Sequence, residues 1–157
     1  MKDRIKFNDA MLTAVMNGRK TQTRRPIKPQ PKVTEDELRK LGAWQDGYTL
    51  SEQVCAAWRH GFIDPDCPYG EIGDIINIAD KDGNIKWKIE ITDVWLQQVQ
   101  EISQDDAYAE GFEGYDDDVT GGLSSYGEFS VMYIDIYGKD SWNNNDWVWV
   151  IEFKKVE

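Results

Sequence analysis

Hydrophobic and polar residues alternate most regularly between residues 85 and 91, where every second position is apolar and the positions between are charged. The apolar face comprises Ile85, Trp87, Ile89 and Ile91. A period of two predicts a half-buried β-strand. The turn-forming residues 80–84 predict that this strand pairs with Ile75–Ala79 in a hairpin.

Three further segments have strand character. Residues 94–100 continue the strand that follows the hairpin turn, and residues 20–27 run from a turn into an extended segment. Residues 147–153 are apolar at both alternating sets of positions, which predicts a central strand covered on two sides.

Helical spacing and capping residues predict five helices, within residues 7–18, 34–44, 49–62, 102–112 and 126–138. In the first, Asn8 or Asp9 can cap the start, and Gly18 suits the left-handed residue after the end. In the fourth, Ser103 is the expected N-cap and Gly111 ends the helix.

The order of these elements predicts an α+β fold with a strongly curved sheet or small barrel and flanking helices. The 157 residues are most simply one domain, 1–157, in which residues 32–67 form a helical insertion. No apolar run approaches the roughly 20 residues of a membrane helix, and the start has no signal-peptide pattern. The two cysteines do not form a disulfide framework, so we expect a cytoplasmic protein with no membrane contact.

Charge is distributed unevenly along a chain whose formal net charge is −11. Residues 1–40 hold 11 Lys or Arg against 5 acids, and the rest hold 7 against 24. Residues 18–26 contain four of the cations, Arg19, Lys20, Arg24 and Arg25. An acidic protein repels a long polyanion except at a local basic patch. This excludes sequence-blind coating of DNA and leaves a short contact with RNA or with a single nucleotide.

Three groups of side chains could suggest a metal site. Residues 80–84 begin like a calcium loop, but Ile85 and Ile91 occupy its sixth and twelfth positions. The adjacent acids at 116–118 do not share one direction. Cys55, His60 and Cys67 lack the close spacing of structural zinc ligands. We therefore expect no metal and no cofactor.

The stretch that holds the four cations resembles the signature of ASCH domains, relatives of the PUA fold. Gly18, Lys20 and Arg25 fit the pattern G-x-K-x-x-E-x-R, with Thr23 in place of the glutamate. The N4-acetylcytidine amidohydrolases, a small bacterial subgroup, also carry threonine there. The wider chain looks more like phage and prophage ASCH-type proteins, and the resemblance covers residues 5–27 and 68–156.

The resemblance implies a PUA-like fold and a site in which Lys20, Thr23 and Glu110 carry any catalysis. The neighbouring polar side chains would then bind ligand: Arg19, Thr21, Arg24 and Arg25.

The residues themselves set two conditions on this site. Lys20 can act as a base only when neutral; Arg24 and Arg25 lower its pKa, whereas Glu110 raises it, which leaves a base and an ion-pair partner both open. Lys20 and Thr23 can meet only if Lys20 lies in the turn or the strand bulges. Neighbours in a strand face opposite sides, so we expect Arg25 at the cleft and Arg24 nearer solvent.

Three functions remain open at this point. The first is a module that binds RNA or a modified nucleotide or nucleoside in a basic-lined cleft. The second is an enzyme, either a hydrolase that removes the acyl group of an N4-acylated cytidine or a ribonuclease. The third is an acidic, phage-encoded protein that docks on a host protein. In addition, Lys20 and Glu110 could be only a structural tie.

Overall fold

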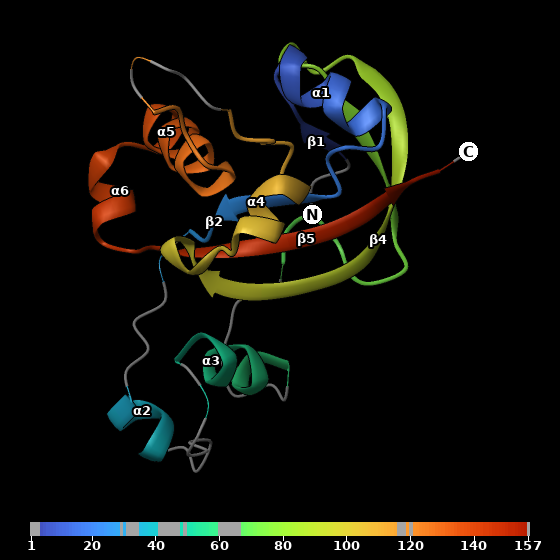
Figure 1. Ribbon diagram of the computed structural model, residues 1–157. Coiled ribbons are helices and arrows are strands. Elements are labelled where there is room, and N and C mark those ends of the chain that lie inside the picture. Colours follow the sequence, from blue (N-terminus) through green and yellow to red (C-terminus); the bar gives the residue numbers. More distant parts are fainter. Residues whose placement is uncertain are drawn as a thin grey trace.

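The computed structural model describes residues 4–28, 30, 35–40, 48, 50–59, 67–115, 119 and 121–156. The strands are β1 (Arg4–Lys6), β2 (Gln22–Pro26), β3 (Ile75–Ala79), β4 (Ile85–Gln98) and β5 (Trp147–Lys155). The α-helices are α1 (Asp9–Met16), α2 (Glu35–Lys40), α3 (Leu50–Arg59), α4 (Gln104–Ala109), α5 (Ser125–Tyr137) and α6 (Lys139–Asn143), and Val99–Glu101 form a 3-10 turn (Figure 1).

The described strands form one curved sheet in the order β1-β3-β4-β5-β2, in which β1 and β3 are parallel and the other pairs antiparallel. The two edge strands approach each other, because Arg25 Nη2 of β2 donates a hydrogen bond to the Lys6 carbonyl of β1 at 2.8 Å. The sheet therefore wraps into an incomplete barrel. This confirms the predicted α+β class and the strongly curved sheet.

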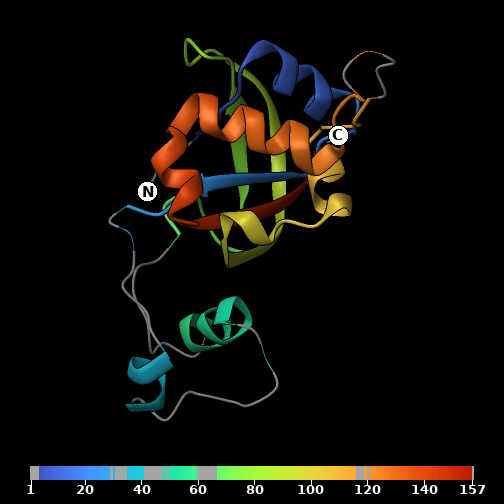
Figure 2. The same cartoon turned by 60° about the vertical axis from the view of Figure 1, so that its left-hand side comes forward.

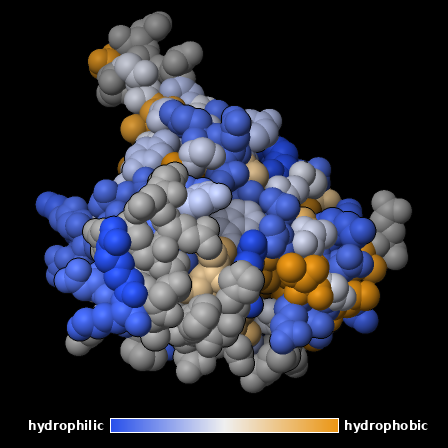
Figure 3. Space-filling model, turned by 90° about the horizontal axis from the view of Figure 1, so that it is seen from below, coloured by the Kyte–Doolittle hydropathy of each residue, from blue (hydrophilic) through white to orange (hydrophobic). Residues whose placement is uncertain are grey.

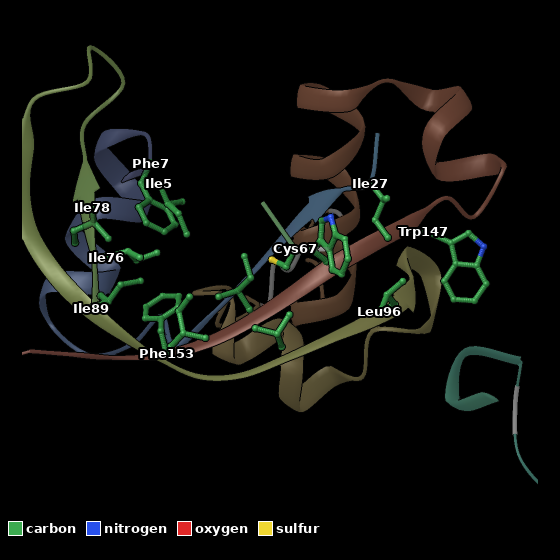
Figure 4. Packing of buried hydrophobic residues seen from close by; sticks show 14 of the residues in the cluster. Ile5, Phe7, Ile27, Cys67, Ile76, Ile78, Ile89, Leu96, Trp147 and Phe153 are labelled. Atoms are coloured by element: carbon green, nitrogen blue, oxygen red, sulfur yellow. The ribbon is translucent and has the colours of Figure 1, made fainter. Parts of the chain in front are cut away.

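Strand β5 lies between β4 and β2, as its apolar pattern predicts. Trp149, Ile151 and Phe153 belong to the core inside the barrel, part of which is shown in Figure 4. Val148 and Val150 belong to a second core, shared with α4 and α5, on the outer side. Both faces of β5 are therefore buried in hydrophobic cores, which explains why apolar and polar residues do not alternate in its sequence.

The β3–β4 hairpin is present as predicted, and Asp80 Oδ1 closes its turn by accepting from the backbone N–H groups of Asp82 and Asn84. One prediction about it is wrong. Ile85 and Trp87 are 50% and 38% exposed, because this end of the hairpin extends beyond the core. Figure 2 shows the turn standing past the body of the sheet, next to α1.

The predicted helix caps are confirmed. Asn8 Oδ1 accepts from the Met11 N–H at the start of α1, and Gly18 adopts a φ of +83° after its end. Ser103 caps α4 through the Asp106 N–H. The sequence patterns missed β1 and α6, which have three and five residues and are too short to show a period.

Part of the expected insertion belongs to the main core. Val54 and Ala57 of α3 are buried in the cluster inside the barrel, and the Trp58 ring meets the Trp149 ring edge-on at 5.3 Å. Division of the chain into one domain with an insertion at 32–67 stays a prediction.

Across the described residues, none of the helices has the length and apolar character needed to cross a membrane. The underside is mostly hydrophilic, with a hydrophobic patch along one side (Figure 3).

Candidate functional site

Strand β2 presents two different faces. Thr23 and Arg25 pair with residues of β5 that point into the barrel, whereas Gln22 and Arg24 pair with residues that point outwards, where α4 and α5 pack. Paired residues in an antiparallel sheet share a face. Neighbouring residues of the basic stretch therefore enter separate environments.

The outer face carries a buried charge network centred on Arg24. Its Nη1 donates to Glu110 Oε2 at 3.2 Å and to Gln22 Oε1 at 2.9 Å, and its Nη2 donates to Asp106 Oδ2 at 3.3 Å. Nε donates to Gln97 Oε1 at 3.2 Å. The Arg24 side chain is 0% exposed. Our expectation that Arg24 lies nearer solvent is wrong, because α4 and Glu110, the residue that follows its last turn, cover this face.

Lys20 joins the same network from the connection between α1 and β2. Its backbone N–H donates to the Ala14 carbonyl, and its Nζ donates to Glu110 Oε1 at 2.7 Å and to the Glu110 carbonyl at 2.8 Å. Both side chains of this ion pair are 2% exposed. Lys20 lies in the turn before β2, which is one of the two placements that the sequence analysis required for Lys20 to meet Thr23. The structure thus brings together Lys20 and Glu110, which are separated by 90 positions.

Burial lowers the pKa of Lys20 below its usual value. Glu110 raises this pKa through its charge and its hydrogen bond, and the positive charges of Arg25 and Arg24 lower it. Because desolvation is the largest of these effects, the protein favours the neutral amine more than water does.

The inner face is built on Phe7, the residue that follows β1. The Arg25 guanidinium carbon lies 5.2 Å from the centre of the Phe7 ring, and Lys20 Nζ lies 5.8 Å from it. Arg25 Nε donates to Thr23 Oγ1 at 3.1 Å. Thr23 is buried and Arg25 is half-buried. Among the described residues, the Thr23 hydroxyl thus bonds to Arg25, and no hydrogen bond joins it to Lys20 or Glu110.

Two tyrosines complete this neighbourhood. Burial raises the pKa of Tyr137, the last residue of α5, and the nearby charge and hydrogen bonding of Arg25 lower it. Tyr69 and Glu110 also act on this pKa and raise it. Sequence reasoning missed both tyrosines. Tyr137 has the helical spacing of a core residue, and Tyr69 lies in a loop without periodicity.

The remaining predicted ligand-binding residues lie at the margin. Arg19 is exposed and forms an ion pair with Glu113 at 3.1 Å. Thr21 is half-buried and bonds through its backbone, since its N–H donates to the Ala109 carbonyl and its carbonyl accepts from Phe153. In the part of the chain that the structure describes, neither side chain forms a hydrogen bond or ion pair with the Arg24 network.

Within the described ranges, no group of three or more potential metal ligands converges. Cys67 is buried, and burial raises the pKa of its thiol. His60 and the acids at 116–118 lie outside the described residues. A separate shallow hollow runs along α5, where Glu128 and Asp135 line it together with apolar side chains, and it holds none of the predicted site residues.

No protein-family model matches the chain, and no curated protein matches it. Solved structures do match. An ASCH domain from Lactobacillus crispatus JV V101 is 14% identical, with a TM-score of 0.50 over 94% of this chain and 70% of that one. Protein EF3133 from Enterococcus faecalis V583, assigned to family DUF984, is 14% identical, with a TM-score of 0.53 over 99% of this chain and 77% of that one. At this identity the likeness is one of fold, and the chain has the PUA-like fold of ASCH domains, as predicted.

Proposed function

We propose that this protein is an ASCH-type module that binds RNA or a modified nucleotide, and that the ligand contacts the inner face of β2 at Arg25. The observation that carries the proposal is the different state of the two adjacent arginines. Arg24 is enclosed by acceptors from the protein, whereas Arg25 is half-buried beside Phe7 and Tyr137.

The groups around Arg25 suit a nucleotide chemically. A guanidinium donates in pairs to a phosphate or a base edge, and aromatic rings stack on bases. The contacts of Arg25 with Thr23 and with the Lys6 carbonyl hold the guanidinium in one orientation. A partly exposed cation that is already oriented loses little side-chain entropy when it binds.

In this proposal the buried network gives the site a rigid back wall. Lys20 and Arg24 share the Glu110 carboxylate, and Asp106 takes a second bond from Arg24. These contacts join β2 to α4. Lys20 and Glu110 then position the strand that carries Arg25, with no need for either to touch the ligand.

A hydrolase is the second candidate, and the lowered pKa of Lys20 favours it. A neutral Lys20 would take the proton of Thr23 as the hydroxyl oxygen attacks the acyl carbon of an N4-acylated cytidine. Glu110, hydrogen-bonded to Lys20, would pass this proton on to the leaving amine, and water would then hydrolyse the acyl–Thr23 ester to free Thr23 and a carboxylic acid. We rank it second because Lys20, Thr23 and Glu110 are all buried, and Thr23 Oγ1 accepts from Arg25.

One experiment separates the two candidates. Wild-type, Arg25→Gln and Thr23→Val proteins are tested for binding of a labelled single-stranded oligoribonucleotide and of N4-acetylcytidine, and deacetylation is followed by mass spectrometry. The module predicts binding without turnover, and weaker binding in Arg25→Gln. Turnover that is lost in Thr23→Val with binding retained would place the hydrolase first. Wild-type protein that binds neither ligand would contradict both.

A further inference from the structure

Although the chain after residue 40 is strongly acidic, five of its seven Lys and Arg residues lie on the β3–β4 hairpin or at the end of β5. Two more cations come from β1, which pairs with β3. Lys155 pairs with buried Ile89 and so faces the other side of the sheet. We call the remaining set the hairpin basic surface: Arg4, Lys6, Lys81, Lys86, Lys88 and Lys154. The acids of the same hairpin segment are Asp80, Asp82 and Glu90, so the local balance is +3 in a chain of −11.

Strand pairing brings these cations to one part of the sheet. Arg4 lies opposite Asn77, and Asn77 lies opposite Lys88, so the three residues form a row across β1, β3 and β4. Arg4 Nη1 donates to the Gly83 carbonyl in the hairpin turn at 2.8 Å. The Lys6 side chain reaches the same turn, where its Cε would lie 3.6 Å from a Cβ placed on Gly83.

The acids of this surface neutralise it only weakly. Lys86 and Asp80 are 3.8 Å apart, and so are Lys154 and Glu90. The two lysine side chains are 49% and 66% exposed. Exposed pairs of this kind contribute little to stability, so an incoming phosphate can replace them at little cost.

An exposed aromatic ring lies on the opposite face of the hairpin, because Trp87 pairs with buried Ile78 and alternates with Lys86 and Lys88. The Trp87 indole N–H donates to the Val156 carbonyl at 2.6 Å, and Lys155 Nζ lies 5.3 Å from the ring centre. Exposed Ile85 and Ile75 flank the same hairpin. The Trp87 ring and the side chains of Lys86 and Lys88 therefore face different sides of the sheet, and the contact expected at the hairpin basic surface is with phosphates.

Lys6 connects this surface to the site proposed above, because its carbonyl accepts the hydrogen bond from Arg25 while its side chain lies over the hairpin turn. We propose that the hairpin basic surface binds the phosphate backbone of a single-stranded RNA, of which one nucleotide occupies the Arg25 site. The inference rests on the proposed function. The chain's net negative charge opposes a long duplex, so the contact is limited to a few nucleotides of one strand.

The test measures binding of a fluorescent eight-nucleotide RNA by anisotropy at several salt concentrations. Lys86→Gln/Lys88→Gln is compared with Lys40→Gln/Lys139→Gln, which removes the same charge from exposed lysines elsewhere. We expect the hairpin variant to bind about tenfold more weakly at low salt, with a salt slope smaller by roughly 1.4 for two lost phosphate contacts. The control is expected to change less than twofold, and thermal melting checks that both variants are folded.

A Trp87→Leu variant is a second control, because this ring lies on the opposite face of the hairpin from Lys86 and Lys88. We expect its affinity for the RNA to change less than twofold, with the salt slope unchanged. Equal binding of the RNA by the hairpin variant and the control would overturn the inference.

Two further measurements distinguish possible failures. A mononucleotide should bind equally to wild-type protein and to the hairpin variant. If the mononucleotide binds equally to both proteins and a longer RNA binds no more tightly than the mononucleotide, only the hairpin inference fails. If wild-type protein binds neither ligand, the proposed function fails with it. Binding to vesicles rich in phosphatidylserine in place of RNA would also overturn the inference.

Discussion

Arg24 and Arg25 are adjacent in the sequence and lie in unlike regions of the molecule. The outer region, around Arg24, is a closed set of charges between β2 and α4, in which every nitrogen of the guanidinium donates to a side chain. The inner region, around Arg25, combines a half-buried cation with aromatic rings and a buried hydroxyl. Strand alternation separates the two arginines, and the helix that covers one face makes their environments different.

The outer and inner regions of β2 contribute differently to stability and to binding. In the outer region Lys20 and Arg24 are matched by Glu110 and Asp106, so removing one member leaves a buried charge without its partner. In the inner region Arg25 is partly solvated, so its loss leaves little uncompensated charge. We therefore expect the outer region to determine stability and the inner region to determine binding.

The largest expected effect is that of Glu110→Ala. This variant leaves Lys20 and Arg24 without the carboxylate they share, and we expect it to lose about 3–5 kcal/mol of unfolding free energy in urea denaturation. Glu113→Ala is the matched control, because it removes an exposed ion pair with Arg19 and should cost less than about 1 kcal/mol. Equal losses for the two variants would show that the Arg24 network does not stabilise the fold.

A smaller effect is expected for Phe7→Leu, which keeps an apolar side chain in the core and removes the ring beside Arg25. The lost cation–π contact is worth about 1 kcal/mol, so RNA binding should weaken about fivefold. Phe129→Leu removes a ring from the other core and serves as the control. If both variants bind RNA equally well, the Phe7 ring does not position Arg25.

The smallest effect concerns pH. The folded protein releases the Lys20 proton at a lower pH than the unfolded chain, whose lysine pKa is 10.5. Between the two pKa values the unfolded chain binds more protons, so unfolding free energy rises with pH and levels off above 10.5. The difference in unfolding free energy between wild-type and Lys20→Met should therefore grow as pH rises towards 10.5 in urea titrations. Lys139→Met should follow the wild-type profile. A difference that shrinks with rising pH would show that Glu110 outweighs burial.

The sequence predicts those features that depend on local periodicity and capping. Alternation indicated β4, the two-sided apolar pattern indicated β5, and Asn8 and Ser103 cap the helices they were expected to cap. The pairing of Lys20 with Glu110 came from a resemblance, since no local pattern relates residues 90 positions apart.

The features that the sequence predicted wrongly or missed have physical reasons. Alternation placed Arg24 and Arg25 on opposite faces, but it could not show that α4 and Glu110 cover the face of Arg24. The alternation of residues 85–91 also could not show that the end of the β3–β4 hairpin extends beyond the core, which leaves Trp87 partly exposed. Tyr137 approaches Arg25 through the packing of α5 on the barrel, and that arrangement depends on tertiary contacts.

The most direct test of this account compares Arg24→Gln with Arg25→Gln in two measurements, urea unfolding and anisotropy of a labelled single-stranded RNA. We predict that Arg24→Gln loses about 3 kcal/mol of unfolding free energy and that its folded fraction still binds RNA. We predict that Arg25→Gln unfolds within about 1 kcal/mol of wild-type and binds RNA at least about tenfold more weakly. The opposite pattern, with binding lost in folded Arg24→Gln and retained in Arg25→Gln, would contradict the assignment of the ligand to the inner face of β2.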